Sequence, residues 1–409
     1  MVNKKMWGLT LLERNVKELE RMGLLNIHLL TTLEENPLAH FCHPLPETIQ
    51  IATHQAQKER PYESLITLLK NESQTVLVLE GHALNDRRLL NLLIKSRQDL
   101  VIVSPGGENP AAIARLSQSS LSVIETLPSG NLSEGLKSLV EKGKLNSYNF
   151  QNFDPYLDNL RREVPPYLLK IENETQFKEA EYILKQTVHK GVLELVAKYI
   201  HPPLEFGSVK LIAETEITPN QITLVWLVMA VLVLPLFMKG LLLPGIILSA
   251  LVGVLDGVDG KLARLTLRFS KTGDRLDHVS GVIYDALWYL ALGWYFSGGN
   301  LYSIEAYTTY ALLGFYIIHR VVPGIFRALF GREIYDYQKI DVFARLIGAR
   351  MNNNVWLLLL GILIGYPRET FYLIAIWMGL TACWFVVRLS WVSINELFTE
   401  KKYQFSNEG

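Results

Sequence analysis

Three aspartates in the second half of the chain are the residues best suited to chemistry. Asp256 and Asp259 lie three residues apart at the end of a strongly apolar segment, and Asp277 opens the next such segment. On a helix this spacing puts both side chains on one face, so they can reach one cation. Carboxylates at a membrane boundary need compensation, and hard oxygen ligands suit Mg²⁺ or Mn²⁺ better than zinc. The pattern predicts a metal-dependent enzyme that acts on phosphate esters.

Small and basic residues surround these aspartates. Gly257 and Gly260 leave space in which a phosphate group can approach the helix backbone, and Gly273 offers a second such place. Arg264 lies about one turn beyond Gly260, and its planar fork suits a pair of pyrophosphate oxygens. These residue types favour a substrate that carries a pyrophosphate.

Two simpler interpretations fit the aspartate pair by itself. Two acidic residues at a helix end commonly form a solvated cap, and the D-x-x-D-G start resembles a calcium loop. No glutamate stands where a calcium loop requires one. The spacing to Arg264, Gly273 and Asp277, between two apolar segments, favours the metal site over the cap.

Long apolar runs dominate the chain from about Ile222 onward, whereas charges are scattered through the first half. A membrane span needs about 20 mostly apolar residues. Thr218 and Pro219 suit the start of a helix, as its cap and its first residue. Six segments meet or nearly meet this requirement: 222–238, 241–256, 276–297, 305–328, 354–366 and 371–393.

Basic residues predict the orientation of these segments. They cluster in the gap between the second and third segments and in the gap between the fourth and fifth. By the positive-inside rule, both termini and the aspartate-rich gap face the cytosol of a multi-pass protein in the cytoplasmic membrane. Cys42 and Cys383 are the two cysteines, which fits a reducing cytosolic face, and no cleavable signal peptide is expected at the start. The net charge of zero gives no indication of nucleic acid, and none is expected as a partner.

The first half of the chain is expected to fold as an α/β domain with a mainly parallel sheet. A helix over Leu11–Met22 precedes strands at Asn26–Leu30, Thr75–Leu79 and Val101–Ser104. Residues 191–214 alternate apolar and charged positions, which fits a helix along the membrane interface and equally a plain linker helix. The expected domains are 1–190 (cytosolic α/β), 191–221 (linker helix), 222–397 (all-α membrane domain of six transmembrane helices) and 398–409 (cytosolic tail).

The stretch from Asp256 to Asp277 resembles the signature of the CDP-alcohol phosphatidyltransferases, D-x2-D-G-x2-A-R-x8-G-x3-D-x3-D. The resemblance implies a six-span membrane enzyme that transfers a phosphatidyl or related group from a CDP-alcohol donor to an alcohol or phospho-polyol acceptor, with release of CMP. It also implies two Mg²⁺ or Mn²⁺ ions and a homodimer in the lipid bilayer. The residues that it assigns to the metal are Asp256, Asp259 and Asp277, and those that it assigns to the CDP group are Gly260, Ala263, Arg264 and Gly273.

One signature position departs from the family pattern. The last aspartate, which in the family binds metal and is the proposed general base, is Gly281 here. Asp285 lies one turn further along the same face and is a candidate substitute base beside Asp277, or else a buried polar residue bonded to a neighbouring helix. Asp274 lies about one turn in the other direction. A base must lie within hydrogen-bond reach of the acceptor hydroxyl.

Further basic residues lie near the expected cytosolic boundary. In the family an arginine in the area of Arg345 and Arg350 helps to hold the acceptor phosphate, so both are candidate substrate residues, although a positive-inside anchor explains them equally well. His319 and Arg320 lie within the fourth apolar segment. They either line a polar cavity there, or Arg320 extends its charge toward the membrane interface.

The first half resembles a sugar-phosphate nucleotidyltransferase domain. The matching stretches are Gly8–Arg14, Val76–His82 and Tyr167–Glu181, and this domain order is similar to that of fused inositol-phosphate cytidylyltransferase/di-myo-inositol-phosphate-phosphate synthases. The Gly-rich phosphate loop is not present in the sequence. His82 stands where the family has a metal-binding aspartate, and Glu172 remains near the second metal position with Lys170 beside it.

These departures predict a catalytically inactive domain that serves as a regulatory or structural partner, with a truncated gene start as the competing explanation. For the whole chain, two classes stay open: an active CDP-alcohol phosphotransferase, or a non-catalytic scaffold that keeps the CDP-alcohol pocket. A transporter is a weaker third class, because no internal repeat is evident.

Overall fold

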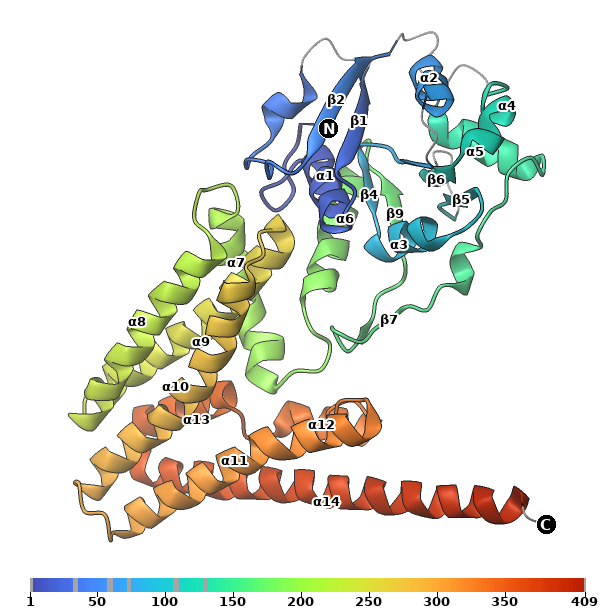
Figure 1. Ribbon diagram of the computed structural model, residues 1–409. Coiled ribbons are helices and arrows are strands. Elements are labelled where there is room, and N and C mark those ends of the chain that lie inside the picture. The colour runs from blue at the N-terminus through green and yellow to red at the C-terminus, as the bar shows by residue number, and fades with distance from the viewer. Residues whose placement is uncertain are drawn as a thin grey trace. The chain divides into compact units, whose positions relative to one another are not determined.

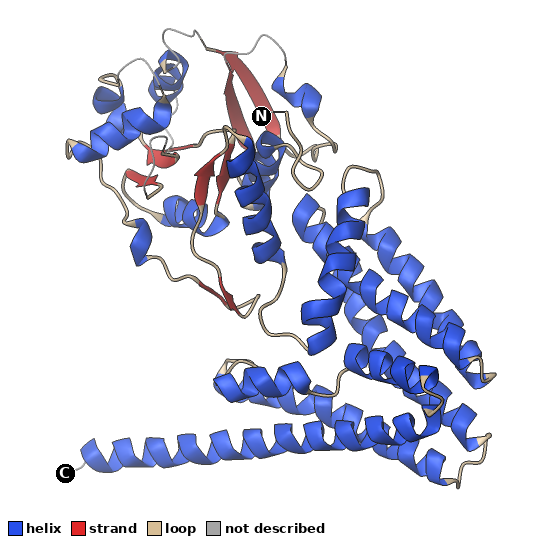
Figure 2. Ribbon diagram, turned by 180° about the vertical axis from the view of Figure 1, so that it is seen from behind, coloured by secondary structure: helices blue, strands red, loops and turns tan. Residues whose placement is uncertain are grey.

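The computed structural model describes residues 3–31, 36–56, 62–71, 75–105, 110–127 and 131–407. The chain divides into two compact units, each made of several chain segments. The first unit comprises Met1–His189, Lys210–Glu216 and Arg264–Leu267, and the second comprises Lys190–Val209, Ile217–Ala263 and Arg268–Gly409. Figures 1 and 2 show the chain from opposite sides.

The first unit contains all the strands of the described residues and several short helices (Figure 2). Its strands are β1 (Asn26–Thr31), β2 (Gln50–Gln55), β3 (Val76–Val78), β4 (Ala83–Asn85), β5 (Leu100–Val103), β6 (Ala112–Leu116), β7 (Tyr156–Leu157), β8 (Arg162–Glu163) and β9 (Leu168–Lys170). Its α-helices are α1 (Leu11–Arg21), α2 (Glu63–Asn71), α3 (Arg87–Lys95), α4 (Leu121–Ile124), α5 (Leu132–Glu141) and α6 (Glu174–Val188). The expected first helix and the three expected strands therefore form where the sequence predicted them, within one or two residues.

The prediction of a mainly parallel sheet was wrong for the described residues. There β1 and β2 pair in parallel, whereas four pairs are antiparallel: β3 with β6, β5 with β6, β4 with β9 and β7 with β8. A parallel pair needs a crossover connection of about a dozen or more residues. The segment 104–111 between β5 and β6 is too short for one, and these two strands pair antiparallel.

The helices of the first unit bury one apolar face against these short sheets. Leu89, Leu90 and Leu93 of α3 are fully or almost fully buried and pack with Ile102 and Ile113 of the sheet. Removing such a leucine would cost about 2–5 kcal/mol of stability, because a cavity would remain. The elements that carry the nucleotidyltransferase-like motifs are thus held by an ordinary apolar core.

The second unit is helical throughout its described residues. A short π-helix (Val196–Ile200) leads into α7 (His201–Ile212), so the expected helix over 191–214 forms in part. The remaining helices are α8 (Pro219–Met238), α9 (Leu242–Thr266), α10 (Lys271–Ser297), α11 (Ile304–Phe330), α12 (Lys339–Ile347), α13 (Met351–Leu363) and α14 (Pro367–Asn407). Thr218 caps α8 and forms a reciprocal capping box with Gln221, and Pro219 is the first residue of the helix, as the sequence predicted.

Five helical segments among the described residues are long and apolar enough to cross a membrane. They are Pro219–Met238, Leu242–Thr266, Ile304–Phe330, Lys339–Leu363 and Pro367–Glu396. The third expected span, 276–297, coincides with the helix α10, which is not among these five segments. The fifth expected span, which was short, is extended on its N-terminal side by α12 and the turn before α13.

The core of the second unit is aromatic and draws on several helices. Trp226, Phe237, Trp288, Tyr289 and Phe371 are fully or almost fully buried in one cluster. Because the other faces of these helices expose many large apolar side chains, the unit has the apolar exterior expected of a protein that lies in lipid. This core fixes α9 and α10, which carry the signature residues.

Candidate active site

The signature residues lie on two successive helices. α9 carries Asp256, Asp259, Gly260, Ala263 and Arg264 in its last turns, and α10 carries Gly273, Asp277, Gly281 and Asp285 in its first turns. Ser270 caps α10 by accepting a hydrogen bond from the Gly273 backbone N–H at 3.1 Å. Only residues 267–270 separate the end of α9 from the start of α10.

Asp259 is buried and held by two donors from α8. The hydroxyl of Thr223 donates to Asp259 Oδ2 at 2.6 Å, and the indole Nε1 of Trp226 donates to the same oxygen at 3.1 Å. Only 5% of Asp259 is exposed. Donors of this kind orient a carboxylate ligand and fix its charge, as outer-shell partners do in metal sites. No pattern in the sequence indicates this contact, because it depends on how α8 packs against α9.

Asp256 is exposed, in contrast to Asp259, and its carboxyl group interacts with that of Asp277. The charges of Asp259 and Asp285 also act on Asp256. Carboxylates that gather in this way repel each other unless a cation or a proton lies among them. The structure thus brings Asp256 and Asp277 together and keeps Asp259 within electrostatic range.

The donor set fits Mg²⁺ or Mn²⁺, since the three side chains supply hard carboxylate oxygens. Across the described residues, however, no group of three or more His, Cys, Asp or Glu side chains has the spacing of a metal site. The fit therefore rests on the chemistry of the oxygens and on the contact between Asp256 and Asp277. Substrate phosphates commonly complete a Mg²⁺ shell that a protein holds by one or two carboxylates.

The expected role of Gly257 needs correction. A side-chain carbon at this position would lie 1.8 Å from Oε1 of Glu205, so the space beside Gly257 holds a glutamate of α7 and does not admit a phosphate. Gly273 is similar, because a carbon there would lie 2.2 Å from Oδ1 of Asn220. Both glycines permit close approach, as predicted, but the groups that approach belong to the protein. A CDP-binding role for Gly273 stays a prediction.

Gly281 and Asp285 lie on α10 as the sequence placed them. A side-chain carbon added to Gly281 would meet no atom within 4 Å. Asp285 is held by α11: Arg320 Nη2 donates to its Oδ2 at 2.7 Å, and the Tyr316 hydroxyl is 3.5 Å from the same oxygen. Asp285 thus bonds to a neighbouring helix, and Arg320 has a definite carboxylate partner. The side chain of Asp274 lies outside the described residues.

Arg345 is buried and paired with a carboxylate that the sequence did not single out. Its Nη2 lies 3.4 Å from Glu194 Oε2, and its guanidinium lies over the ring of Tyr335, 4.3 Å from the centroid. Burial opposes ionisation of Glu194, but Arg345 and Arg350 outweigh it and lower the pKa of its carboxyl group to about 2. Glu194 is therefore charged, and it already engages Arg345.

Arg350 is the residue before α13, and its surroundings differ from those of Arg345. Within the part of the chain that the structure describes, Arg350 has no ion pair at salt-bridge distance, while Glu194, Asp285 and Tyr316 act on its charge. Arg345, in contrast, is paired with Glu194. His319 is buried in α11, where its Nε2 lies 3.3 Å from the carbonyl oxygen of Met378. That contact gives His319 a structural role.

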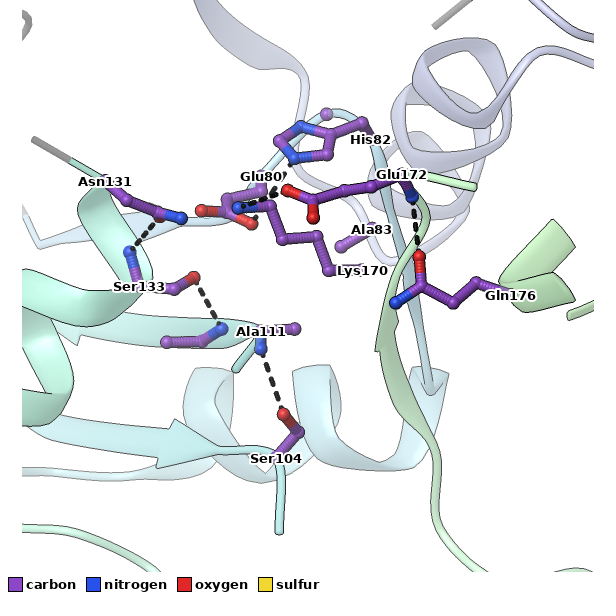
Figure 3. A network of polar contacts seen from close by, with 12 residues as sticks. Glu80, His82, Ala83, Ser104, Ala111, Asn131, Ser133, Lys170, Glu172 and Gln176 are labelled. Carbon is purple, nitrogen blue, oxygen red and sulfur yellow. Dashed lines mark hydrogen bonds and ion pairs between the residues drawn. The ribbon is translucent and has the colours of Figure 1, made fainter. Parts of the chain in front are cut away.

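The first unit holds a separate polar cluster where the nucleotidyltransferase-like motifs meet. Figure 3 shows the side chains of Glu80, His82, Lys170 and Glu172 directed toward one another. Lys170 Nζ lies 3.0 Å from Glu172 Oε1, and His82 Nε2 lies 3.8 Å from Glu80 Oε2. Burial lowers the pKa of His82, Glu80 opposes this shift and Lys170 adds to it. This cluster therefore combines a neutral imidazole with a lysine–glutamate ion pair.

Comparisons with known proteins agree with the signature. Residues 216–389 match the family model of CDP-alcohol phosphatidyltransferase. A relative from Thermococcus kodakarensis, named bifunctional IPC transferase and DIPP synthase, is 29% identical over 202 residues, which cover 47% of this chain and 43% of the relative. The match thus spans less than half the length of that relative.

Two solved structures of phosphatidylinositol phosphate synthase from Mycobacterium tuberculosis also match. One has CDP-DAG bound (16% identity, TM-score 0.34, covering 46% of this chain and 93% of that one). The other, with manganese and citrate, has 16% identity and a TM-score of 0.33, and covers 46% and 88% of the two chains. Similarity at this level supports no conclusion about fold or ligand. The family match, which covers residues 216–389, shows that the C-terminal half of this chain is similar to CDP-alcohol phosphatidyltransferases.

Proposed function

We propose that the chain is a membrane transferase that moves a phosphatidyl or phospho-alcohol group from a CDP-alcohol to an acceptor alcohol. The observation that carries this proposal is the family match over residues 216–389, within which Asp256 of α9 interacts with Asp277 of α10. The name of the relative from Thermococcus kodakarensis supports inositol phosphodiesters as one class of product. Phospholipid precursors are the other class.

The reaction is a phosphoryl-group transfer with CMP as the leaving group. The acceptor oxygen bonds to the phosphorus that carries the donor alcohol, the bond from this phosphorus to the CMP oxygen breaks, and the hydroxyl proton passes to a base. Two Mg²⁺ or Mn²⁺ ions, held by Asp256, Asp259 and Asp277, would neutralise the charge of the donor pyrophosphate. Thr223 and Trp226 keep Asp259 in orientation.

Further residues serve the substrates. Arg264 binds pyrophosphate oxygens. Gly260, Ala263 and Gly273 border the CDP group. Arg350, which has no ion pair at salt-bridge distance among the described residues, holds the acceptor phosphate, and Arg345 supports this site through Glu194.

Asp285 is the proposed base in place of the aspartate that Gly281 lacks. The ion pair with Arg320 fixes the position of Asp285, so the acceptor hydroxyl must come to it or reach it through a water molecule. Asp277 is the second candidate for the base, because its carboxyl group interacts with that of Asp256.

The membrane arrangement is part of the proposal. We infer that α10 is the third of six spans, that both termini face the cytosol and that the chain forms a dimer in the cytoplasmic membrane. The clusters of basic residues between spans two and three and between spans four and five support this orientation. Proteolysis of closed vesicles at sites introduced into these loops would test it.

The first unit is proposed to be inactive as a nucleotidyltransferase and to act as a structural partner. The pair Lys170–Glu172 and the imidazole of His82 support inactivity. Within this unit Arg14 Nη2 donates to the carbonyl oxygen of Leu265, a residue of the last turn of α9, at 2.5 Å. Formation of a CDP-alcohol from CTP and a polyol phosphate by the purified chain would overturn this part of the proposal.

One alternative function rests on a specific observation. Gly281 can neither bind metal nor accept a proton, so a scaffold that keeps the CDP-alcohol pocket without catalysis remains a candidate. Release of CMP from a panel of CDP-alcohols, offered with polyols, phosphoinositols and glycerophosphate, separates the two functions. We expect CMP release from the purified chain that Asp259→Ala abolishes.

A further inference from the structure

We propose that Glu205 is a positioning residue for the signature helix α9, and that it sets the direction in which Asp256 points. The inference rests on the proposed function, because it assigns Glu205 a role in the site that Asp256 helps to form. Glu205 lies on α7, in the segment Lys190–Val209, which contributes no residue to the signature.

Glu205 is fixed against α9 by two contacts. Its Oε2 lies 2.5 Å from Nζ of Lys261, and the side chains are 5% and 8% exposed, respectively. Its Oε1 fills the space beside Gly257, where any side-chain carbon would come within 1.8 Å of it. A buried ion pair leaves a costly charge behind when one partner is removed. Glu205 and this face of α9 therefore hold each other in one arrangement.

The rest of the segment is fixed in the same way. The Nδ2 of Asn352 donates to Glu194 at 3.2 Å, and the backbone N–H of Val196 donates to Asn353 Oδ1 at 3.1 Å. Trp356 Nε1 donates to Nε2 of His201 at 3.2 Å. These contacts attach the start of the segment to α13, so α7 has a fixed support from which Glu205 can hold α9.

The helix geometry shows what this contact controls. At about 100° per residue, Lys261 lies about 40° around α9 from Gly257, so both face α7. Asp259, which is bound by Thr223 and Trp226 of α8, lies about 160° from Gly257 on the other side. Asp256 falls between these two faces and is exposed. Because α9 is held on both sides, it cannot rotate, and Asp256 is directed into the remaining open sector.

The test compares Mn²⁺ binding with turnover in the detergent-solubilised full chain. Electron paramagnetic resonance of Mn²⁺ measures metal affinity without substrate, and CMP release gives kcat and KM. Glu205→Ala should weaken Mn²⁺ binding about 10-fold, as loss of outer-shell support does, and lower kcat about 10- to 100-fold with little change in donor KM. Glu205→Gln, which keeps the shape and a contact with Lys261, should show a smaller loss in both measurements.

Two further variants separate positioning from general stability. Arg388→Gln breaks the buried pair of Arg388 Nε with Asp341 Oδ1 (2.6 Å) elsewhere in the same unit, and it should lower the thermal stability while Mn²⁺ affinity stays at the parent value. Gly257→Ala should weaken Mn²⁺ binding by displacing Glu205. The double variant Gly257→Ala/Glu205→Ala should bind no more weakly than Glu205→Ala, since the obstruction is gone.

Each result decides the proposal. Parent-like Mn²⁺ affinity in Glu205→Ala would overturn it, and so would a parent chain that binds no Mn²⁺. If Glu205→Ala weakens Mn²⁺ binding but the parent releases no CMP from any donor, the positioning role stands and the proposed reaction fails. If the parent is active and Glu205→Ala equals it in kcat, the positioning role fails and the reaction stands.

Discussion

The carboxylate of Asp285 on α10 accepts a hydrogen bond from the guanidinium of Arg320 on α11 at 2.7 Å. Asp285 lies one turn beyond Gly281, the position at which the family signature has its last aspartate. Asp277 lies one turn before Gly281 and Asp285 one turn after it, and Asp285 is bonded to α11. Whether this chain catalyses transfer depends on whether Asp285 can accept a proton while it is bonded in this way.

If Asp285 is the base, its amide variant should be nearly inactive. Asp285→Asn keeps the shape of the side chain but cannot accept the proton, so we expect kcat to fall about 10²- to 10⁴-fold. The measurement is CMP release at saturating donor. Asn354→Ala is a matched control, since Asn354 is a buried amide that donates to Tyr289 at 2.7 Å. Equal losses in the two variants would show that Asp285 is structural.

Restoring the signature aspartate should raise activity. The surroundings of Gly281 leave space for a side chain, so Gly281→Asp is expected to fold. A carboxylate there supplies both a metal ligand and a base, and we expect kcat to rise about 10-fold or more over the parent. Gly281→Asn, of the same size but without a base, should not show this rise. An inert parent that becomes active through Gly281→Asp would favour the scaffold function.

The α8 donors to Asp259 should matter for metal affinity. Thr223→Val and Trp226→Phe each remove one hydrogen bond to Asp259 Oδ2 with little change in size. Loss of outer-shell partners usually costs about 10- to 100-fold in metal affinity or activity. Titration of activity with Mn²⁺ measures the effect. Thr309→Val, which removes a hydroxyl that donates to a backbone carbonyl of α11, should leave the titration unchanged.

Stability should depend on pH through His201. Burial lowers the pKa of His201 to about 4 from its ordinary 6.5, Glu194 opposes this shift and Lys261 adds to it. The unfolded chain therefore binds a proton between these values that the folded chain does not, so stability is fully present above about pH 6.5 and falls as the pH drops toward 4. Thermal unfolding over this range should show a smaller slope for His201→Gln. Identical slopes would rule out this contribution.

Local signals in the sequence predicted the helices and strands well. Thr218, Pro219 and Gln221 specify the start of α8 by capping chemistry, which acts within a few residues. The apolar runs likewise specify the helices of the second unit. Strand pairing was predicted less well. The alternation of helices and strands suggested a parallel sheet, but a connection as short as 104–111 can join only antiparallel strands.

The site was predictable only in its acidic residues. Asp256, Asp259 and Asp277 follow from spacing, whereas the partners Thr223, Glu194 and Glu205 depend on how helices pack. Gly257 shows the limit most clearly, since a glycine indicates close approach but not which group approaches. Glu205 carried one signal that could have found it: it is a single acidic residue in the otherwise apolar and basic stretch 195–213.

The most direct test of the central claim is CMP release by the purified full chain and by Asp259→Ala, with Mg²⁺ or Mn²⁺ supplied. We predict turnover of at least one CDP-alcohol by the parent, loss of that turnover on chelation of the metal, and none in Asp259→Ala. Turnover in Asp259→Ala equal to that of the parent would contradict the assignment of this aspartate to the metal site.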